Sequence, residues 1–320
     1  MWQMNALYLL VPCYNEESVL PETARQLEEK MSALIKQGKI CKNSRIVFID
    51  DGSKDNTWSL ISDLHRDHPI FSGVGLSRNK GHQNALLAGL LTVQEQADFT
   101  ISLDADLQDD LNAIDQMVEK YRQGCDVVYG VRKNRVSDTG FKRKSAEWYY
   151  KLVAALGGEV VFNHADYRLL SRRALNALAQ YQESGLFLRG IVPMLGYKTD
   201  TVEYARAPRL SGESKYSLKK MLTLGIDGIT SLSIRPLRLL TFAGVLLLTA
   251  SLGMAVLFLI QHILGSSFWG WRAIMLSVFA VGGLNMLGLG IVGEYAGRAY
   301  METKRRPRFF IDRVLHIGEE

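Results

Sequence analysis

The sequence predicts an α/β fold, a mostly parallel sheet with helices on both faces, followed by interfacial helices and a two-helix transmembrane hairpin. Two observations lead to this prediction. Short apolar runs alternate with helical patterns through the first part of the 320-residue chain, as in parallel sheets that are covered on both faces. Two later runs of about 20 residues each carry no charge, and a helix of that length can cross a bilayer core.

The predicted strands and helices alternate along the first part of the chain. Each strand is a short apolar run bounded by polar turns, and each helix repeats its apolar residues at helical spacing. A cap at Asp55 or Asn56 is expected before the second helix. The predicted strands are residues 6–12, 44–50, 71–77, 98–104 and 126–132, and the predicted helices are residues 16–37, 57–67, 81–96 and 111–124.

A polar cluster follows each of the predicted strands. In chain order the clusters read PCYNEE, DDGSKDN, RNKGHQN, DADLQDD and RKNR. Any one of them alone is more typical of a solvated loop. Together they indicate a binding site, because the carboxyl ends of parallel strands meet at one edge of a sheet and ligands bind there.

The fourth cluster carries the residues expected to hold a metal ion. Asp104 and Asp106 lie two residues apart after a buried strand, and Gln108 follows as a neutral oxygen ligand. Hard oxygen ligands suit Mg²⁺ or Mn²⁺, and the cation would offset the repulsion between the carboxylates. Asp109 and Asp110 precede a predicted helix, where acids are favoured as N-cap and first-turn residues. We therefore expect these last two aspartates to start the helix.

The sequence lacks two common glycine-rich motifs that bind the phosphates of nucleotides. The sequence has no G-x-x-x-x-G-K-[ST] loop, and no G-x-G-x-x-G follows the first strand. A kinase or a dinucleotide-dependent dehydrogenase is therefore not supported. Asp50 and Asp51 lie on a glycine-containing turn, where a carboxylate can accept hydrogen bonds from a base or a ribose. A nucleotide would then be held through acids and a metal.

Charge and cysteine content set broad limits on partners and compartment. The formal net charge of +5 is compatible with nucleic acid, anionic lipid or phosphorylated substrates. Cys13, Cys41 and Cys125 fit neither a zinc site nor a disulfide framework, so reduced thiols are expected. The first residues show no basic leader of a signal peptide, so the first domain is expected to stay in the cytosol.

The apolar C-terminal part predicts attachment to a membrane. By the positive-inside rule, arginines before the first run and the sequence KRRPR after the second place both ends in the cytoplasm. Buried helices of a soluble protein are the alternative, but two such runs would need a very large core. The predicted organisation is a cytosolic catalytic domain (1–210), a juxtamembrane amphipathic segment (211–236), transmembrane helices (237–264 and 273–296), an external loop (265–272) and a cytosolic basic tail (297–320).

Two further segments are expected at the membrane surface. Residues 211–236 combine lysines with apolar residues near helical spacing, which is typical of an interfacial helix, although a core helix shows a similar pattern. Residues 141–152 mix basic and aromatic side chains, a composition that also suits single-stranded nucleic acid. The nearby apolar runs favour the membrane and argue against a nucleic-acid partner.

The motifs VPCYNEE, DDGSKDNT, LSRNKGHQNAL and LDADLQDD occur in this order and resemble the signature of inverting family-2 glycosyltransferases with a GT-A (Rossmann-like) fold. ADYRLLSRRAL, SGESKYSLKK and the terminal hairpin followed by GEYAGRAYMETKRRPRFF are similar to the polyprenyl-phosphate glycosyltransferases, which include dolichol-phosphate mannose synthase. The closest pattern is that of the bacterial undecaprenyl-phosphate (bactoprenol) glucosyltransferases, with KRKSAEWYYKL as a further match. The resemblance covers nearly the whole chain.

The resemblance implies roles for the matched residues. Asp166, Asp106 and Arg132 would be catalytic. Because a lipid phosphate is already mostly a dianion at neutral pH, Asp166 is expected to orient groups rather than to accept a proton. Gly81, His82 and Gln83 lie within one of the matched motifs, but some relatives have other residues there, so no role is carried over to them. The metal would be held by Asp104, Asp106 and Gln108, the nucleotide by Pro12, Tyr14, Glu16, Asp51 and Asp104, and the acceptor phosphate or membrane would be met by Arg132, Arg135, Arg168, Arg209, Ser214 and Lys215.

The resemblance also implies a reaction. A hexose, expected to be glucose from UDP-glucose, would pass with inversion to undecaprenyl phosphate at the cytoplasmic face of the inner membrane, with Mg²⁺ or Mn²⁺ as cofactor. The product would serve cell-envelope or O-antigen modification. A homo-oligomer such as a tetramer stays open. One alternative is the same reaction with another donor: a UDP-aminoarabinose derivative, UDP-GlcNAc or GDP-mannose. A second is a catalytically silent lipid-phosphate-binding membrane protein, which the intact Asp104, Asp106 and Gln108 disfavour. A third is a nucleotidyltransferase, which would need a glycine-rich triphosphate loop.

Overall fold

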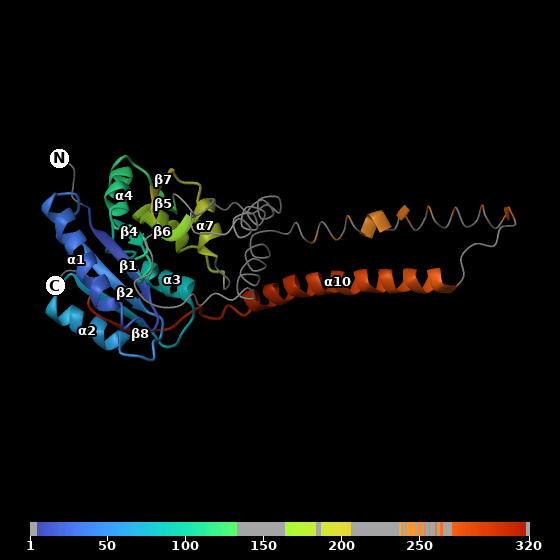
Figure 1. The fold of residues 1–320 in the computed structure, drawn as a ribbon, viewed down its shortest axis with the longest axis horizontal. Helices are drawn as coiled ribbons and strands as arrows, with labels where there is room; N and C mark the ends of the chain where they lie inside the picture. Colours follow the sequence, from blue (N-terminus) through green and yellow to red (C-terminus); the bar gives the residue numbers. More distant parts are fainter. Residues whose placement is uncertain are drawn as a thin grey trace.

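An eight-stranded mixed sheet forms the centre of the computed structural model (Figure 1). The structure describes residues 5–132, 164–183, 187–205 and 271–317, together with isolated positions between 237 and 264. Within these residues the strands are β1 (Leu7–Cys13), β2 (Arg45–Asp50), β3 (Phe71–Leu76), β4 (Phe99–Ser102), β5 (Val127–Arg132), β6 (His164–Ser171), β7 (Thr199–Tyr204) and β8 (Ile311–Val314). The helices are α1 (Leu20–Lys36), α2 (Thr57–Asp67), α3 (His82–Thr92), α4 (Ala113–Arg122), α6 (Arg172–Leu178), α7 (Leu188–Met194) and α10 (Trp271–Thr303).

The strand order across the sheet is β7-β5-β6-β4-β1-β2-β3-β8. β1 is parallel to β2 and β4, β2 is parallel to β3, and β5 is parallel to β7. β6 is antiparallel to β4 and β5, and β8 is antiparallel to β3. The predicted α/β architecture is confirmed, and β1 to β5 correspond to the five predicted strands. The strands β6, β7 and β8 were not predicted.

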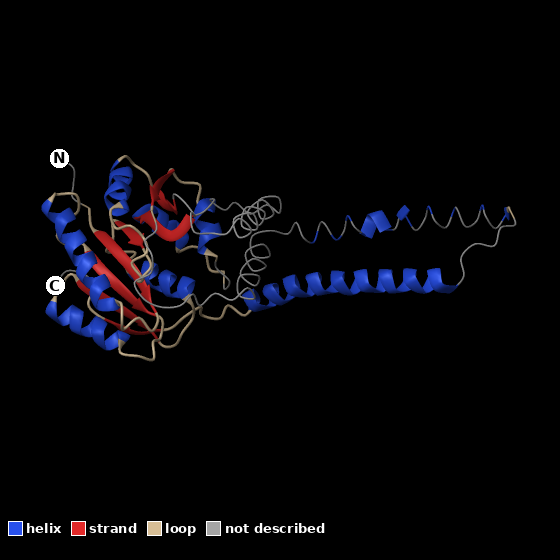
Figure 2. Cartoon of the chain, viewed as in Figure 1, coloured by secondary structure: helices blue, strands red, loops and turns tan. Residues whose placement is uncertain are grey.

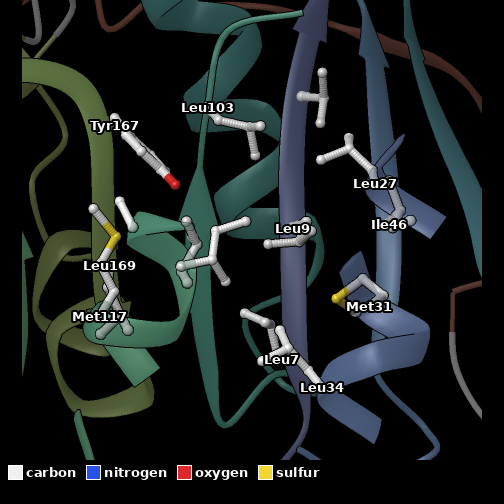
Figure 3. Close-up of a cluster of buried hydrophobic side chains, with 14 of the residues drawn as sticks. Leu7, Leu9, Leu27, Met31, Leu34, Ile46, Leu103, Met117, Tyr167 and Leu169 are labelled. Atoms are coloured by element: carbon white, nitrogen blue, oxygen red, sulfur yellow. The ribbon is translucent and has the colours of Figure 1, made fainter. Parts of the chain in front are cut away.

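Helices cover both faces of the sheet (Figure 2). Because successive side chains of a strand point to opposite faces, Leu7 and Leu9 of β1 join a buried cluster with residues of α1, α2 and α4. Tyr8 and Leu10 of the same strand join a second cluster with residues of α3, α6 and α7. Figure 3 shows part of the first cluster, where Met31 of α1 lies beside the strands. This packing fixes the strands, and so fixes where the loops at their ends lie.

The first helix is shorter than predicted. The apolar spacing predicted a helix from residue 16, whereas α1 begins at Leu20 with Pro21 in its first turn. Proline is favoured there because the first helical N–H groups have no partner inside the helix. The buried side chains of α1 recur every three or four residues, from Leu20 through Leu27 to Leu34, which is the pattern that predicted the helix. The residues freed before Leu20 belong to the loop after β1, which lines the site described below.

The C-terminal segment closes one edge of the sheet. Beyond the β8–β3 pairing, Leu315 N donates to Gly73 O at 2.8 Å, and Ser72 Oγ donates to the carbonyl oxygen of His316 at 2.7 Å. The sequence of residues 297–320 predicts only a basic tail, and the strand inside it was not predicted. β8 satisfies backbone groups of β3 that would otherwise form an open edge.

The predicted membrane hairpin is not confirmed. α10 covers the second predicted span and projects from the sheet, with its C-terminal end the nearer one (Figure 1). No helix within the residues that the structure describes is both long enough and apolar enough to cross a membrane. The first predicted span (237–264) and the amphipathic segment (211–236) lie outside the described residues, apart from isolated positions. The hairpin therefore stays a prediction.

Candidate active site

Polar loops meet at the carboxyl edge of the sheet. β1, β2, β3 and β4 run in one direction, and β5 shares it because both β4 and β5 are antiparallel to β6. The polar clusters after the first four strands therefore gather at one edge, as predicted. Arg132, the last residue of β5, lies at the same edge.

The loop after β1 is tied to the turn after β2. Asn15, with a φ of 53°, donates its backbone N–H to Ser53 Oγ at 2.9 Å. Glu16 donates its backbone N–H to Thr57 Oγ1 at 3.0 Å. These bonds hold one wall of the site in place. The predicted nucleotide-binding residues on this wall are the buried Pro12 and the half-buried Tyr14 and Glu16, and their contacts with a base stay a prediction.

Asp51 joins the turn after β2 to the loop after β3. Its buried carboxylate accepts hydrogen bonds from the backbone N–H groups of Lys80 at 2.6 Å and Gly81 at 2.8 Å. Burial raises the pKa of Asp51, and these two donors lower it in part. The next residue, Gly52, has a φ of 66°, and a Cβ there would lie 2.6 Å from the Cα of Arg78. Asp51 therefore organises backbone at this edge, and its contact with a base stays a prediction.

The loop after β4 presents a pair of carboxylates. Asp104 and Asp106 are half-buried, and Gln108 donates its backbone N–H to Asp106 Oδ1 at 3.3 Å. Leu107, between them, has a φ of 52°, a conformation that is rare for residues other than glycine and often marks a functional loop. The side chain of Gln108 is buried, so its role as a metal ligand stays a prediction.

The donor set of this loop fits a Mg²⁺-like cation. Within the described residues, no group of three or more His, Cys, Asp or Glu side chains could hold a metal ion. Mg²⁺, however, usually takes only one or two protein carboxylates and completes its shell with water and substrate phosphates. Asp104 and Asp106 supply two such carboxylates at an accessible edge. The charge on the neighbouring Asp109 supports this assignment.

Neither Asp109 nor Asp110 starts a helix, contrary to the expectation from the sequence. α4 begins at Ala113, and Asp109 is buried with its Oδ1 accepting a hydrogen bond from Tyr204 Oη at 2.6 Å. Arg132 Nη2 lies 3.9 Å from the same oxygen. Burial, followed by the negative charge of Asp104, raises the pKa of Asp109 to about 6. The loop thus carries negative charge that the protein does not fully compensate, which favours a bound cation.

Asp166, the predicted catalytic aspartate, lies on β6 between two arginines. It is 8 % exposed, and it accepts hydrogen bonds from Arg168 Nη2 and, at both oxygens, from Arg189 at 3.1 and 2.9 Å. Burial alone would raise the pKa of Asp166, but the charges of Arg189 and Arg168 outweigh it and hold the pKa well below its ordinary value. Asp166 is therefore an anion at neutral pH and only a weak base, which does not favour a role as proton acceptor.

The two arginines differ in access to solvent. Arg168 is 2 % exposed, and its Nη1 donates to the carbonyl oxygen of Leu188 at 3.2 Å. A direct contact of Arg168 with an acceptor phosphate stays a prediction that this geometry does not favour. Arg189, in the first turn of α7, has a side chain that is 38 % exposed. Arg189 was not predicted as a site residue, although a single charge in the apolar run of residues 186–192 is typical of an arginine that is paired in the fold.

His82 lies close to both halves of the site. Its Nε2 is 3.7 Å from Asp104 Oδ1 and 3.6 Å from Asp166 Oδ2. Both distances are longer than a hydrogen bond. Nε2 is shielded from solvent and has no hydrogen-bond partner within the described part of the chain. The neighbouring Gln83 accepts the backbone N–H of Leu188 at 3.3 Å, which ties the start of α3 to α7. The structure thus brings the predicted metal ligand and the predicted catalytic aspartate to one imidazole.

Several predicted site residues fall outside the described part of the chain. They include a basic residue just after β5 and the basic residues that were expected close to the membrane. The surface-seeking segment 141–152 falls there as well. The predicted residues concerned are Arg135, Arg209, Ser214 and Lys215.

The arrangement has an acidic and a cationic half. On one side, Asp104, Asp106 and Asp109 form an anionic loop that can take a divalent cation and, through it, phosphate groups. On the other side, Arg189 presents a guanidinium held in a fixed orientation by Asp166. A guanidinium held in this way is suited to a second phosphate or carboxylate. The site can therefore hold two anionic groups close together, because a cation on one side and a guanidinium on the other reduce the repulsion between them.

Comparison with known proteins places these features in a family. The sequence model described as "Glycosyl transferase family 2" matches residues 8–179. An uncharacterized glycosyltransferase, YkoT of Bacillus subtilis, is 46 % identical over 97 % of this chain and 92 % of its own length. A prophage bactoprenol glucosyl transferase homolog of Escherichia coli is 38 % identical over 96 % and 98 %, and a bactoprenol glucosyl transferase of Shigella phage SfX is 38 % identical over 95 % and 97 %.

Proposed function

Because this chain belongs to glycosyl transferase family 2 and is a glycosyltransferase with a GT-A-like sheet, we propose that it transfers a hexose from a nucleotide sugar to a polyprenyl phosphate at a membrane surface. The expected donor is UDP-glucose and the expected acceptor is undecaprenyl phosphate. The names of the relatives from Escherichia coli and Shigella phage SfX support this choice. No part of the proposal depends on an oligomer.

The observation that carries the proposal is that Asp104 and Asp166 both lie close to His82 Nε2, at 3.7 and 3.6 Å. The donor diphosphate would lie on the Asp104 side, together with a divalent cation. The acceptor phosphate would lie on the Asp166 side, where Arg189 is half-exposed. The reacting carbon of the sugar would then sit between the two anions. This separation meets the main physical problem of the reaction, which is the repulsion between two phosphorylated substrates.

The ionisation of Asp166 supports this division of roles. A phosphate monoester has its second pKa near 6, so the acceptor is mostly a dianion at neutral pH and needs no strong general base. Asp166, held as an anion by Arg189 and Arg168, is in any case unsuited to take a proton. Its role in the proposal is to fix the guanidinium of Arg189. This agrees with the orienting role expected from the sequence.

The proposed reaction is a single displacement with inversion. An oxygen of the acceptor phosphate forms a bond to the anomeric carbon, and the bond from that carbon to the β-phosphate oxygen of the donor breaks. The electron pair of the broken bond leaves with the nucleoside diphosphate, and no proton needs to move. A bound Mg²⁺ or Mn²⁺ supplies charge stabilisation to the diphosphate, and Asp104 and Asp106 would hold the ion.

Attachment to a membrane is part of the proposal because a polyprenyl phosphate stays in the bilayer. The apolar segment 237–296 would provide the attachment, in the predicted cytoplasmic orientation at a bacterial inner membrane. Large apolar side chains along α10 are exposed in the isolated chain, and such surface is unfavourable in water. They include Ile274, Val278, Met286, Leu287 and Leu289.

A donor panel tests the proposed function. The full-length protein in detergent would be given Mg²⁺, undecaprenyl phosphate and radiolabelled UDP-glucose, UDP-GlcNAc, GDP-mannose or a UDP-aminoarabinose derivative. We expect lipid-linked label from UDP-glucose, with the opposite anomeric configuration to the donor. Transfer from another donor alone would replace the glucose assignment. No transfer from any donor, with Mg²⁺ or with Mn²⁺, would refute the proposed reaction.

A further inference from the structure

His82 carries a hydrogen-bond donor that the folded chain does not use. Its side chain is 37 % exposed, yet Nε2 itself is shielded and has no hydrogen-bond partner among the described residues. Other histidines of the chain are bonded: His65 Nδ1 lies 2.7 Å from the carbonyl oxygen of Phe71, and His68 Nδ1 lies 2.8 Å from Glu28 Oε1. A shielded polar atom without a partner costs free energy, so it calls for a ligand.

The surroundings of Nε2 define what that ligand would be. The atom faces oxygens of Asp104 and Asp166 at distances too long for hydrogen bonds, so neither carboxylate satisfies it. Asp166 is already matched by Arg168 and Arg189, whereas Asp104 has no arginine or lysine ion pair within the described chain. A hydrogen-bond acceptor that arrives with a cation on the Asp104 side therefore fits best. A diphosphate oxygen has this chemistry.

The backbone around His82 holds the imidazole in this position. Gly81 and Lys80 are fixed by the Asp51 carboxylate, and Gln83 is fixed by the N–H of Leu188. His82 is the first residue of α3, so the positive end of the helix dipole lies at the same point and favours an anionic group there. The ring is therefore preorganised and need not be ordered when substrate binds.

We propose that His82 is a catalytic residue whose Nε2–H donates a hydrogen bond to the leaving β-phosphate oxygen of the nucleotide sugar. This inference rests on the proposed function and adds to it a group that acts at the broken bond. As the bond between the anomeric carbon and that oxygen breaks, negative charge grows on the oxygen, and the hydrogen bond strengthens. The proton stays on His82, so the balance of the reaction is unchanged. The donor is present in the neutral Nε2–H tautomer as well as in the imidazolium.

Two substitutions separate the donor from the shape of the ring. His82→Gln places an amide N–H at similar reach, whereas His82→Leu fills the space without a donor. We expect His82→Leu to lower kcat about 100-fold with little change in the KM of the donor, since the contact forms mainly in the transition state. His82→Gln should retain kcat within about 10-fold of the wild-type value. The matched control is His68→Leu, at an exposed histidine beyond α2, which should keep the wild-type kcat.

Binding of the leaving group gives a readout that does not depend on turnover. Calorimetry with UDP and with GDP, each in the presence of Mg²⁺, first identifies which nucleotide the wild-type protein binds more tightly. That nucleotide should bind about 10-fold more weakly to His82→Leu and with near wild-type affinity to His82→Gln. Thermal unfolding would check that both variants fold. The proposal is overturned if His82→Leu keeps the wild-type kcat and affinity, or if Gln and Leu lose activity equally.

The same experiment separates this inference from the proposed function. If the wild-type protein transfers sugar and the His82 variants behave like His68→Leu, only the assignment of His82 fails. If the wild-type protein transfers no sugar but binds UDP or GDP, the proposed reaction fails and the binding comparison still decides the His82 contact. If neither nucleotide binds the wild-type protein, both fail.

Discussion

Arg189 grips Asp166 at two points, with Nε donating to Oδ1 at 3.1 Å and Nη2 donating to Oδ2 at 2.9 Å. Because both oxygens of Asp166 are engaged, the planar guanidinium is fixed relative to β6. Arg168 binds the same carboxylate from the buried side and is further held by the carbonyl oxygen of Leu188. The Asp166 carboxylate thus binds both the buried Arg168 and the half-exposed Arg189.

The Asp166→Asn substitution should destabilise the protein strongly. It leaves the buried guanidinium of Arg168 without a counter-charge, and breaking a buried pair in this way typically costs about 3–5 kcal/mol. The measurement is the free energy of unfolding in detergent. The control is Asp200→Asn, which breaks a half-exposed pair with Lys120 and should cost no more than about 1 kcal/mol. Similar losses in both variants would contradict the role given to Asp166.

The stability that Asp166 contributes should disappear in acid. Its pKa in the folded protein is lower than its ordinary value of 3.8, so the unfolded chain takes up a proton first as the pH falls. The difference in unfolding free energy between the wild type and Asp166→Asn should therefore be constant above about pH 5 and shrink below about pH 4. A denaturation series across this range measures it. A difference that grows in acid would show that Asp166 has a raised pKa instead.

Asp106→Asn should abolish turnover and leave the protein folded. Asn removes a charge that the proposed cation needs, whereas Asp106 is half-buried and its loss costs little packing. The measurement is sugar transfer across a Mg²⁺ titration, together with recovery in the membrane fraction. Asp110→Asn is the control in the same loop, because Asn can still accept the backbone N–H of Asn112. Wild-type rates in Asp106→Asn would remove this residue from the metal site.

Arg189→Lys should weaken the acceptor side of the site selectively. Lysine keeps the charge but loses the planar two-point contact with Asp166, so the cation is no longer held in one orientation. We expect the KM for the polyprenyl phosphate to rise about 10-fold and the KM for the nucleotide sugar to stay the same. Steady-state kinetics with each substrate varied in turn measure this. A rise confined to the nucleotide sugar would place Arg189 on the donor side.

Gly52→Ala should disturb the joint between two loops of the site. A Cβ there would lie 2.5 to 2.7 Å from backbone atoms of Arg78 and Asn79, so one of the two loops must move. Gly38 is the matched control, because it has a similar positive φ but open space around it, and its substitution by Ala adds only backbone strain of about 1 kcal/mol. We expect a larger fall in the unfolding midpoint, and weaker nucleotide binding, only for Gly52→Ala.

The first five strands could be predicted because each is a continuous apolar run with a polar cluster after it. Such runs need no knowledge of distant residues. β6 and β8 could not be predicted in the same way, since their place depends on partners far along the chain: β6 lies between β4 and β5, and β8 pairs with β3. The carboxyl edge was therefore predictable, and the completed sheet was not.

The candidate site divides in a similar way. Asp104 and Asp106 could be found from local spacing after a strand. Asp109 was assigned to a helix start because local sequence favours it, whereas its partner Tyr204 comes from β7. Arg189 was missed because its pairing with Asp166 is set by the fold and by no short motif. Site residues that are defined by their position just after a strand can be predicted from the sequence. Site residues that are defined by a partner on a distant strand or helix cannot.

The position of β8 has a consequence for the order in which the protein is made. During synthesis, β1 to β7 emerge before the chain of residues 205–310, and only then does the strand that covers β3 follow. Until that moment the nascent sheet has an open edge that could pair with another chain. The last step of assembly of the catalytic domain must therefore wait until α10 has left the ribosome, so the sheet is completed only after the whole apolar segment has been made.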